Sequence, residues 1–527
     1  MTTHHVSTLM PPSTRFIVGM ASVSTSYDYV IVGAGTAGCV IAAQLSEHDG
    51  ARVLLLEAGS RDPQPLGSVP PAWPKLLGTP ASWGESTVAQ AATGTPMPFP
   101  RGRGLGGSSA INGMIFVRGH RSSYDAWVAA GAKGWGFDDL LPYLCRSENA
   151  VGRDPVVRGV DGPLLVGPSN PRHPVAEAVL AAAVETGFAT ATDISSGLEQ
   201  GFGWNDLSIA DGRRFSAADA YLAPAMGRPD LDVVTNALVH RVTTEAGRAT
   251  GVEYSVGAEQ FRARCEREVV LTAGTVGSAQ LLLRSGIGPQ SHLRDVGVET
   301  VLHLPGVGAN LQDHPQTTVV YSPARPVPPS ANNHAEVTGL IRSDLALDGP
   351  DLQFLAVDMS MHSHAPAGSG QGYAIACALM TPRSRGTVRL TSGEPGAAPA
   401  IDPNYYGDPH DLEVMLTGLR IAREIGRASA LTPWRGFEAM PGRAAQDDAD
   451  LRAHLRSNLL TYFHPVGTCR IGTDTDAVVD TELRVHGIGG LRIADASVMP
   501  TIVSGNTNAT VYGIAERAAD LIAGASS

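Results

Sequence analysis

Three glycines near the N-terminus have the spacing of a turn that binds phosphates. Gly33, Gly35 and Gly38 form the pattern GxGxxG between an apolar strand-like run and an apolar helical run. The first glycine permits the tight turn, the second lets the backbone approach a pyrophosphate, and the third allows close packing of the helix on the strand. Glu57 ends the next apolar run, where a carboxylate can accept hydrogen bonds from ribose hydroxyls. The segment is therefore predicted to bind a dinucleotide, either NAD or FAD.

A second glycine-rich segment extends from Arg101 to Met114, with no strand-like run before it. It is therefore not another turn of the first kind. Its glycines and serines suit a backbone that lies flat against a large planar ligand and its phosphates, and the alternative is an ordinary flexible loop. No second GxGxxG joins a buried strand to a helix, so one dinucleotide is expected and a separate nicotinamide site is disfavoured.

The composition excludes several classes of protein. The chain has 527 residues, of which 43% are hydrophobic and 17% charged, as in a turn-rich globular protein. With a net charge of -12, the protein lacks the excess of positive charge that binding to nucleic acids or anionic membranes requires. No apolar run is long enough for a membrane span. The five cysteines have no zinc-like spacing, which favours free thiols, a cytoplasmic protein and no bound metal.

The elements that must position these motifs are predicted from periodicity. Strands are expected at 27–32, 52–57, 269–274, 374–380, 386–390 and 490–495, and helices at 39–45, 175–187, 278–283, 410–425, 447–459 and 510–522. The pattern indicates a discontinuous nucleotide-binding domain with a second domain inserted into it. The predicted limits are a disordered leader at 1–26, nucleotide-binding parts at 27–170 (with an extended lid segment at 61–100), 227–315 and 462–527, and second-domain parts at 171–226 and 316–461.

At this point the ordered motifs resemble one family. The GxGxxG with Glu57, the run GRGLGGSSxIN at 102–112, the run GTVGSxQLLLxSGIG at 274–288 and the HPxGT at 464–468 are similar to the glucose-methanol-choline (GMC) oxidoreductases. The similarity extends from about Tyr27 to Ala523. It implies an α/β fold, α+β overall, in which a Rossmann-like FAD-binding domain carries an inserted substrate-binding domain built on an antiparallel sheet with helices.

The resemblance also implies the cofactor and its site. FAD is expected, and it is expected to be noncovalent because Ile111 stands where some members attach the flavin through a histidine. The implied FAD-binding residues are Gly33, Gly35, Thr36, Ala37, Gly38, Glu57, Ala58, Arg103, Gly106, Gly107, Ser108, Asn112, Gly113, Met114, Ile115, Val239, Ala273, Asp495, Ala496, Ala509 and Thr510.

Oxidising an alcohol requires a base that takes the hydroxyl proton beside the flavin. By resemblance, His464 is this base and Asn508 is the second polar group, although the segment at 505–508 also reads as a helix N-cap. Phe463 and His362 are weaker candidates for substrate contact, together with His364. His314 is interpreted as structural.

The predicted function is oxidation of a primary alcohol to the aldehyde. The aromatic side chain of Phe463 weakly favours an aromatic alcohol. Electrons would pass to oxygen, giving hydrogen peroxide, or to another acceptor. The alternative is a non-oxidative enzyme on the same fold, either a hydroxynitrile-type lyase or a fatty-acid photodecarboxylase, because fold does not fix chemistry. The expected partner is a small-molecule alcohol, and the sequence does not specify the oligomeric state.

Overall fold

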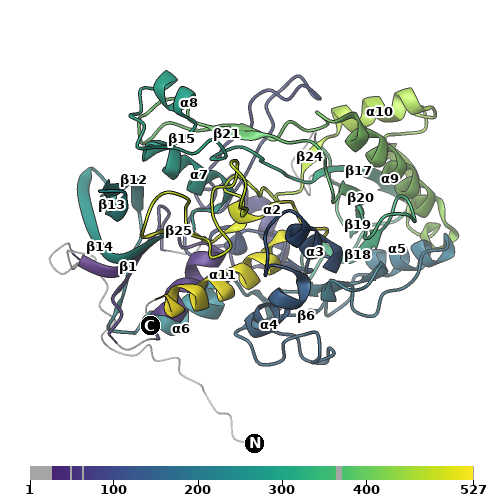
Figure 1. Cartoon of the computed structure of the whole chain (residues 1–527). Coiled ribbons are helices and arrows are strands. Elements are labelled where there is room, and N and C mark those ends of the chain that lie inside the picture. The colour runs from purple at the N-terminus through teal and green to yellow at the C-terminus, as the bar shows by residue number, and fades with distance from the viewer. Residues whose placement is uncertain (1–25, 48–49, 62–63, 364–370, 526–527) are drawn as a thin grey trace, which may run out of the picture.

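The computed structural model describes residues 26–47, 50–61, 64–363 and 371–525. Among these residues, two seven-stranded sheets lie towards opposite ends of the molecule, with helices beside them and between them (Figure 1). The predicted leader at 1–26 lies outside the described residues, apart from Ser26 at the start of the first strand.

The first sheet contains the nucleotide-binding turn. Its strand order is β11-β2-β1-β14-β13-β12, and β25 also pairs with β14. Five of its strands form parallel pairs, and β12 and β13 extend the sheet as an antiparallel hairpin. The parallel strands read as continuous apolar runs because both faces of the sheet are covered. Their bounds are β1 Ser26–Val32, β2 Val53–Leu56, β11 Leu231–Val234, β12 Ala237–Glu245, β13 Arg248–Val256, β14 Glu259–Leu271 and β25 Leu491–Ile493.

The second sheet is antiparallel throughout, in the order β23-β17-β20-β19-β18-β7, with β24 also paired to β17. Residues on its strands alternate between two cores. On β17, Val319 and Tyr321 belong to the core shared with α5 and α9, whereas Val320 packs with Tyr462 on the opposite face. The bounds are β7 Gly201–Trp204, β17 Pro315–Pro323, β18 Ala335–Ile341, β19 Leu352–Val357, β20 Tyr373–Leu379, β23 Arg435–Met440 and β24 Leu460–Thr461.

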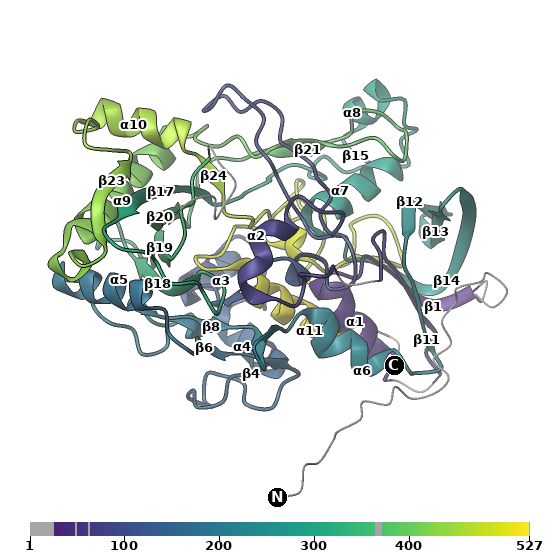
Figure 2. The same cartoon turned by 180° about the vertical axis from the view of Figure 1, so that it is seen from behind.

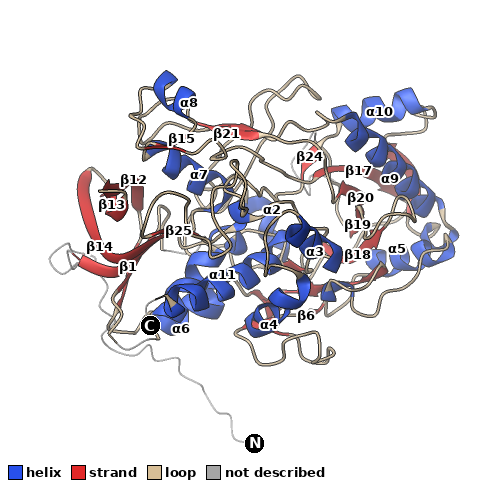
Figure 3. Cartoon of the chain, in the orientation of Figure 1, coloured by secondary structure: helices blue, strands red, loops and turns tan. Residues whose placement is uncertain are grey.

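The helices cover the sheets from several sides (Figure 3). Helices α5, α9 and α10 lie at the end of the molecule that holds the antiparallel sheet, while α1 and α11 lie side by side near the parallel sheet (Figure 2). No helix in the described part of the chain is both long and apolar enough to cross a bilayer. The helix bounds are α1 Thr36–Leu45, α2 Trp73–Leu76, α3 Arg121–Ala129, α4 Phe137–Ser147, α5 Pro174–Glu185, α6 Ala223–Ala225, α7 Gly274–Arg284, α8 Gln290–Asp295, α9 Pro409–Arg427, α10 Asp448–Ser457 and α11 Thr507–Gly524.

The predicted fold class is confirmed, because a parallel sheet with a strand–helix–strand unit is joined to an antiparallel sheet covered by helices. Strand β7, from the segment 171–226, joins strands of the segment 316–461 in one sheet. The residue limits of the two domains stay a prediction. All five cysteines are free thiols, and four of them are buried.

Candidate active site

The glycine turn that follows β1 has the geometry expected of a pyrophosphate cradle. Gly33 has a φ of +103°, which a side chain would strain, and a Cβ on Gly38 would lie 1.9 Å from the Gly33 carbonyl oxygen. A Cβ on Gly35 would meet only the Thr272 carbonyl oxygen, at 3.9 Å. The three glycines therefore serve the turn, the packing of α1 and an open approach to the backbone, as the spacing predicts.

The carboxylate of Glu57 is buried at the end of β2 and held by three backbone N–H groups. Ala34 donates at 2.9 Å, Gly59 at 2.7 Å and Gly104 at 2.9 Å. Burial raises the pKa of this carboxyl, and the backbone hydrogen bonds oppose that rise. The carboxylate thus joins both glycine-rich segments, and it keeps lone pairs that can accept hydrogen bonds from a ligand.

The second glycine-rich segment lies directly on the first. A Cβ on Gly107 would come within 2.7 Å of the Gly35 Cα, so only glycine allows this contact. Ile111 follows in the same segment and lines the cavity described next. Because its side chain contains carbon only, it offers no atom for covalent attachment of a cofactor.

A cavity of about 480 Å³ extends from the glycine turn to His464. Its walls include most of the residues predicted to bind FAD. These are Gly33, Gly35, Thr36, Ala37, Glu57, Ala58, Gly107, Ser108, Asn112, Gly113, Met114, Ile115, Val239, Ala273, Asp495 and Ala496.

Six other predicted residues are not among the cavity walls: Gly38, Arg103, Gly106, His362, Ala509 and Thr510. Thr510 is buried, and its hydroxyl lies 2.8 Å from that of Tyr124. Arg103 donates to the Ala58 carbonyl and lies over the ring of Trp83. His364 lies outside the described residues. Glycines that keep the backbone accessible and an anchored carboxylate fit a bound dinucleotide such as FAD.

His464 follows strand β24 on a loop that Asp313 fixes. The Asp313 carboxylate accepts from the backbone N–H of His464 at 2.8 Å and from the hydroxyl of Thr461 at 2.5 Å, and Tyr405 also donates to it. Burial raises the pKa of Asp313 to about 6. Phe463, just before His464, has a φ of +64°, a conformation that is uncommon for a bulky residue. The loop geometry therefore depends on Asp313.

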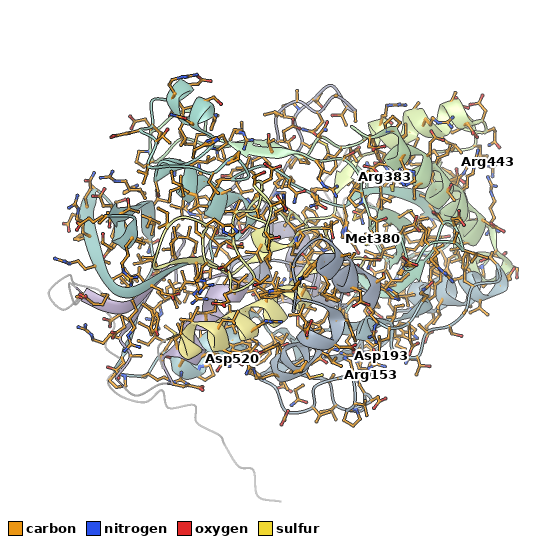
Figure 4. The ribbon with its side chains drawn as sticks, in the orientation of Figure 1. Arg153, Asp193, Met380, Arg383, Arg443 and Asp520 are labelled. Carbon is orange, nitrogen blue, oxygen red and sulfur yellow. The ribbon has the colours of Figure 1, made fainter. Side chains whose placement is uncertain are left out.

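The imidazole of His464 takes part in a directed chain of hydrogen bonds. Its Nδ1 lies 3.0 Å from Nδ1 of His314, whose Nε2 lies 3.2 Å from the carbonyl oxygen of Met380. Met380 lies in the interior of the molecule (Figure 4). At the other side, Asn506 Nδ2 lies 3.3 Å from His464 Nε2, and Asn506 Oδ1 accepts from Gln353 Nε2 at 3.1 Å.

This chain sets the tautomer of His464. A carbonyl oxygen can only accept, so His314 carries its proton on Nε2 and its Nδ1 is an acceptor. His464 then donates from Nδ1, which leaves a lone pair on Nε2 next to the donating amide of Asn506. Burial lowers the pKa of His464 to about 3, and burial and the neighbouring His464 lower the pKa of His314. The side chain of His464 is thus a neutral base whose Nε2 can accept a proton.

The pairing expected between His464 and Asn508 is corrected by these contacts. Asn508 lines the cavity, but its Oδ1 accepts from the hydroxyl of Thr36 at 2.8 Å, at the start of α1. Asn506 takes the place beside His464 instead. Asn506 is the N-cap residue of α11, yet its side chain makes no capping hydrogen bond. The missing capping hydrogen bond indicates that the Asn506 side chain is used elsewhere, and this is visible only in the structure. His314, expected to be structural, contacts His464 directly.

Beyond His464 the cavity walls are mainly apolar and aromatic. Trp73 and Phe463 meet edge to face with ring centroids 6.5 Å apart, and Leu355, Val357 and Met359 come from β19 and the residues after it. Phe463, predicted to contact substrate, therefore lies in the wall of this chamber.

Three acidic residues line the described cavity, and each already has partners. The contacts of Glu57 are given above, Glu85 pairs with Arg101, and Asp495 accepts from Gly274, Ser278 and Ser497.

Comparisons with known proteins agree with this geometry. The two models of the GMC oxidoreductase family match residues 27–316 and 382–515. Human mitochondrial choline dehydrogenase is 38% identical, over 94% of this chain and 90% of the relative. The oxygen-dependent choline dehydrogenase of Vibrio vulnificus is 38% identical, over 94% of each chain. The crystal structure of pyridoxine 4-oxidase from Mesorbium loti superposes with a TM-score of 0.90 at 36% identity, covering 94% of this chain and 98% of that one.

Family models that cover most of the chain, and relatives similar along almost its whole length, place the protein without ambiguity. Most of the residues predicted to bind FAD, and His464, line one cavity. The chain belongs to the GMC oxidoreductase family and is an FAD-dependent oxidoreductase that acts on CH–OH groups.

Proposed function

We propose that the protein oxidises an uncharged primary alcohol, carried on an aromatic ring, to the aldehyde. His464 Nε2 accepts the hydroxyl proton, and the Asn506 amide donates a hydrogen bond to the alcohol oxygen as its negative charge develops. FAD, when bound, supplies the acceptor for the hydride that leaves the alcohol carbon. Trp73 and Phe463 supply an aromatic wall for the rest of the substrate.

The observation that carries this proposal is the direction of the hydrogen-bond chain. The Met380 carbonyl cannot reverse its role as an acceptor, so the lone pair of His464 faces the side of the ring on which Asn506 donates. An alcohol placed between these two groups would donate to the first and accept from the second. That is the pair of contacts that removal of a hydroxyl proton needs.

The charge of the chamber supports an uncharged substrate. Choline, on which several relatives act, carries a permanent positive charge, and burying a charge without a partner is costly. Glu85 pairs with Arg101, Asp495 accepts hydrogen bonds from its neighbours, and Glu57, beside the glycine turn, is expected to bind the cofactor. The described walls therefore leave no carboxylate for a quaternary ammonium on the substrate. Pyridoxine, on which the similarly related 4-oxidase acts, is an aromatic primary alcohol. We therefore propose an alcohol of this second kind.

The electron acceptor in this proposal is oxygen, with hydrogen peroxide as product, or an external acceptor. A single dinucleotide fingerprint supports a reaction without NAD or NADP. Assays that record peroxide, dye reduction and NADH in parallel distinguish these acceptors, and turnover coupled to NADH formation would contradict this part of the proposal.

The proposal is tested by anaerobic stopped-flow reduction of the flavin with pyridoxine and benzyl alcohols. The wild-type flavin should bleach, and His464→Ala should keep its FAD but reduce it about 10²–10⁴-fold more slowly, since it lacks the base. Asn508→Ala, which leaves the base and Asn506 in place, is the matched control. A wild-type flavin that stays oxidised with every alcohol would contradict the proposal and favour a lyase or photodecarboxylase.

A further inference from the structure

Gln316 lies on the face of the antiparallel sheet that borders the substrate chamber. It is the second residue of β17, and it pairs with Ala378 of β20, which pairs in turn with Gln353 of β19. On the same face of β17, Val320 belongs to the apolar cluster behind the chamber. Gln316 and Gln353 therefore occupy one row across the sheet, separated by a single small residue.

The two glutamines of this row have different partners. Gln353 donates to Asn506 and so supports the group beside His464. Gln316 is only 2% exposed and lines the cavity, but its side-chain amide makes no hydrogen bond with any residue in the described part of the chain. A buried amide without partners is costly, and buried polar groups are normally satisfied by a ligand, by water or by protein. The amide of Gln316 is thus one of the polar groups in the chamber wall, together with the hydroxyl of Tyr462, for which a bound ligand can supply a partner.

We propose that Gln316 is a specificity-determining residue, which binds a second, uncharged hydrogen-bonding group on the alcohol substrate. This inference rests on the proposed function. Adjacent strands lie about 4.8 Å apart, so Gln316 is about 10 Å along the row from Gln353, which itself contacts Asn506. The second group on the substrate would therefore be separated from the reacting hydroxyl by about the width of one aromatic ring. A ring hydroxyl has suitable chemistry, because an amide offers both a donor and an acceptor to it.

The test compares benzyl alcohol with its 2-, 3- and 4-hydroxy derivatives in anaerobic flavin reduction. The hydroxy isomer that the wild-type enzyme prefers over benzyl alcohol defines a selectivity ratio of kcat/KM values. Gln316→Leu, which keeps most of the volume and removes both polar atoms, should lower that ratio at least tenfold. Gln316→Glu keeps an acceptor for the ring hydroxyl and should retain more of the ratio than the leucine variant does. Gln260→Leu, at an exposed position of β14, is the matched control and should leave the ratio unchanged.

The possible failures are distinguishable. If the wild-type enzyme reduces its flavin with none of the four alcohols and not with pyridoxine either, the proposed function fails and the role of Gln316 fails with it. If the wild-type enzyme is active, but Gln316→Leu slows all four alcohols by the same factor, only the role of Gln316 is overturned. FAD content and melting temperature of each variant show that a lower ratio does not come from misfolding.

Discussion

Exchanging the two asparagines at the start of α11 for alanine, one at a time, should separate hydride transfer from cofactor retention. Asn506→Ala removes the donor beside His464 Nε2, which we expect to stabilise the alcohol oxygen while it is negatively charged. A hydrogen bond to a charged group contributes about 1.5–3 kcal/mol, and each 1.4 kcal/mol corresponds to a factor of ten. Flavin reduction should therefore slow about 10- to 150-fold. The variant also leaves the amide of Gln353 without its partner, which should lower its melting temperature.

Asn508→Ala removes the acceptor of the Thr36 hydroxyl at the first turn of α1, where the pyrophosphate of FAD is expected. It should release FAD more readily, while the fraction that stays loaded is reduced at nearly the wild-type rate. Stopped-flow spectroscopy under anaerobic conditions measures the reduction rate, and dilution followed by fluorescence of released flavin measures retention. If Asn508→Ala slows reduction more than Asn506→Ala does, the assignment drawn from these contacts is wrong.

Further predictions concern the base and the cofactor. Because burial lowers the pKa of His464 to about 3, its imidazole is neutral throughout pH 5–9, and the rate of flavin reduction at saturating alcohol should not vary over that range; a tenfold loss per pH unit between 7 and 5 would refute this. Gly35→Trp should fold but purify without FAD, since the space above Gly35 is open to the cavity, whereas Gly38→Ala should destabilise the fold itself. A yellow Gly35→Trp protein would contradict the assignment of the glycine turn as the binding site of the FAD pyrophosphate. Acid precipitation should release all flavin, since Ile111 offers no attachment atom, and colour that stays in the pellet would indicate a covalent bond.

Most of the residues expected from the sequence to bind FAD line the cavity, because the motifs that contain them are local. A glycine turn, the strand before it and the helix after it are contiguous, so spacing alone fixes their relative positions. Glu57 could be added because it directly follows the next parallel strand, at the same edge of the sheet. Strands β7 and β18 pair in the antiparallel sheet although they lie far apart in the chain. No local sequence motif predicts such a pairing.

The side chains that meet at His464 could be predicted only in part. His464, predicted as the base, lines the cavity, and its role stays a prediction. Asn506 and Asn508 are two residues apart at the start of a helix, where the backbone turns. Which of the two side chains points at the base depends on where α11 begins and on the partners Thr36 and Gln353, which come from remote segments. Spacing does not contain that information. The contact of His314 with His464 was missed for the same reason, because it joins residues 150 positions apart.

The cavity that extends from the glycine turn is also lined by residues of α11, a helix much further along the chain, and this has a consequence for the order of events in biosynthesis. Thr36 and Asn508 are 472 positions apart, and β25, near the C-terminus, pairs with β14 in the sheet that carries the glycine turn. A growing chain can form the turn early but lacks α11 until residues 507–524 have been synthesised. Such long-range closure is slow to form, and FAD stabilises only the chain that has achieved it. Flavin loading therefore requires a chain that has been synthesised past α11, and a nascent chain stalled before residue 507 should be colourless even when FAD is abundant.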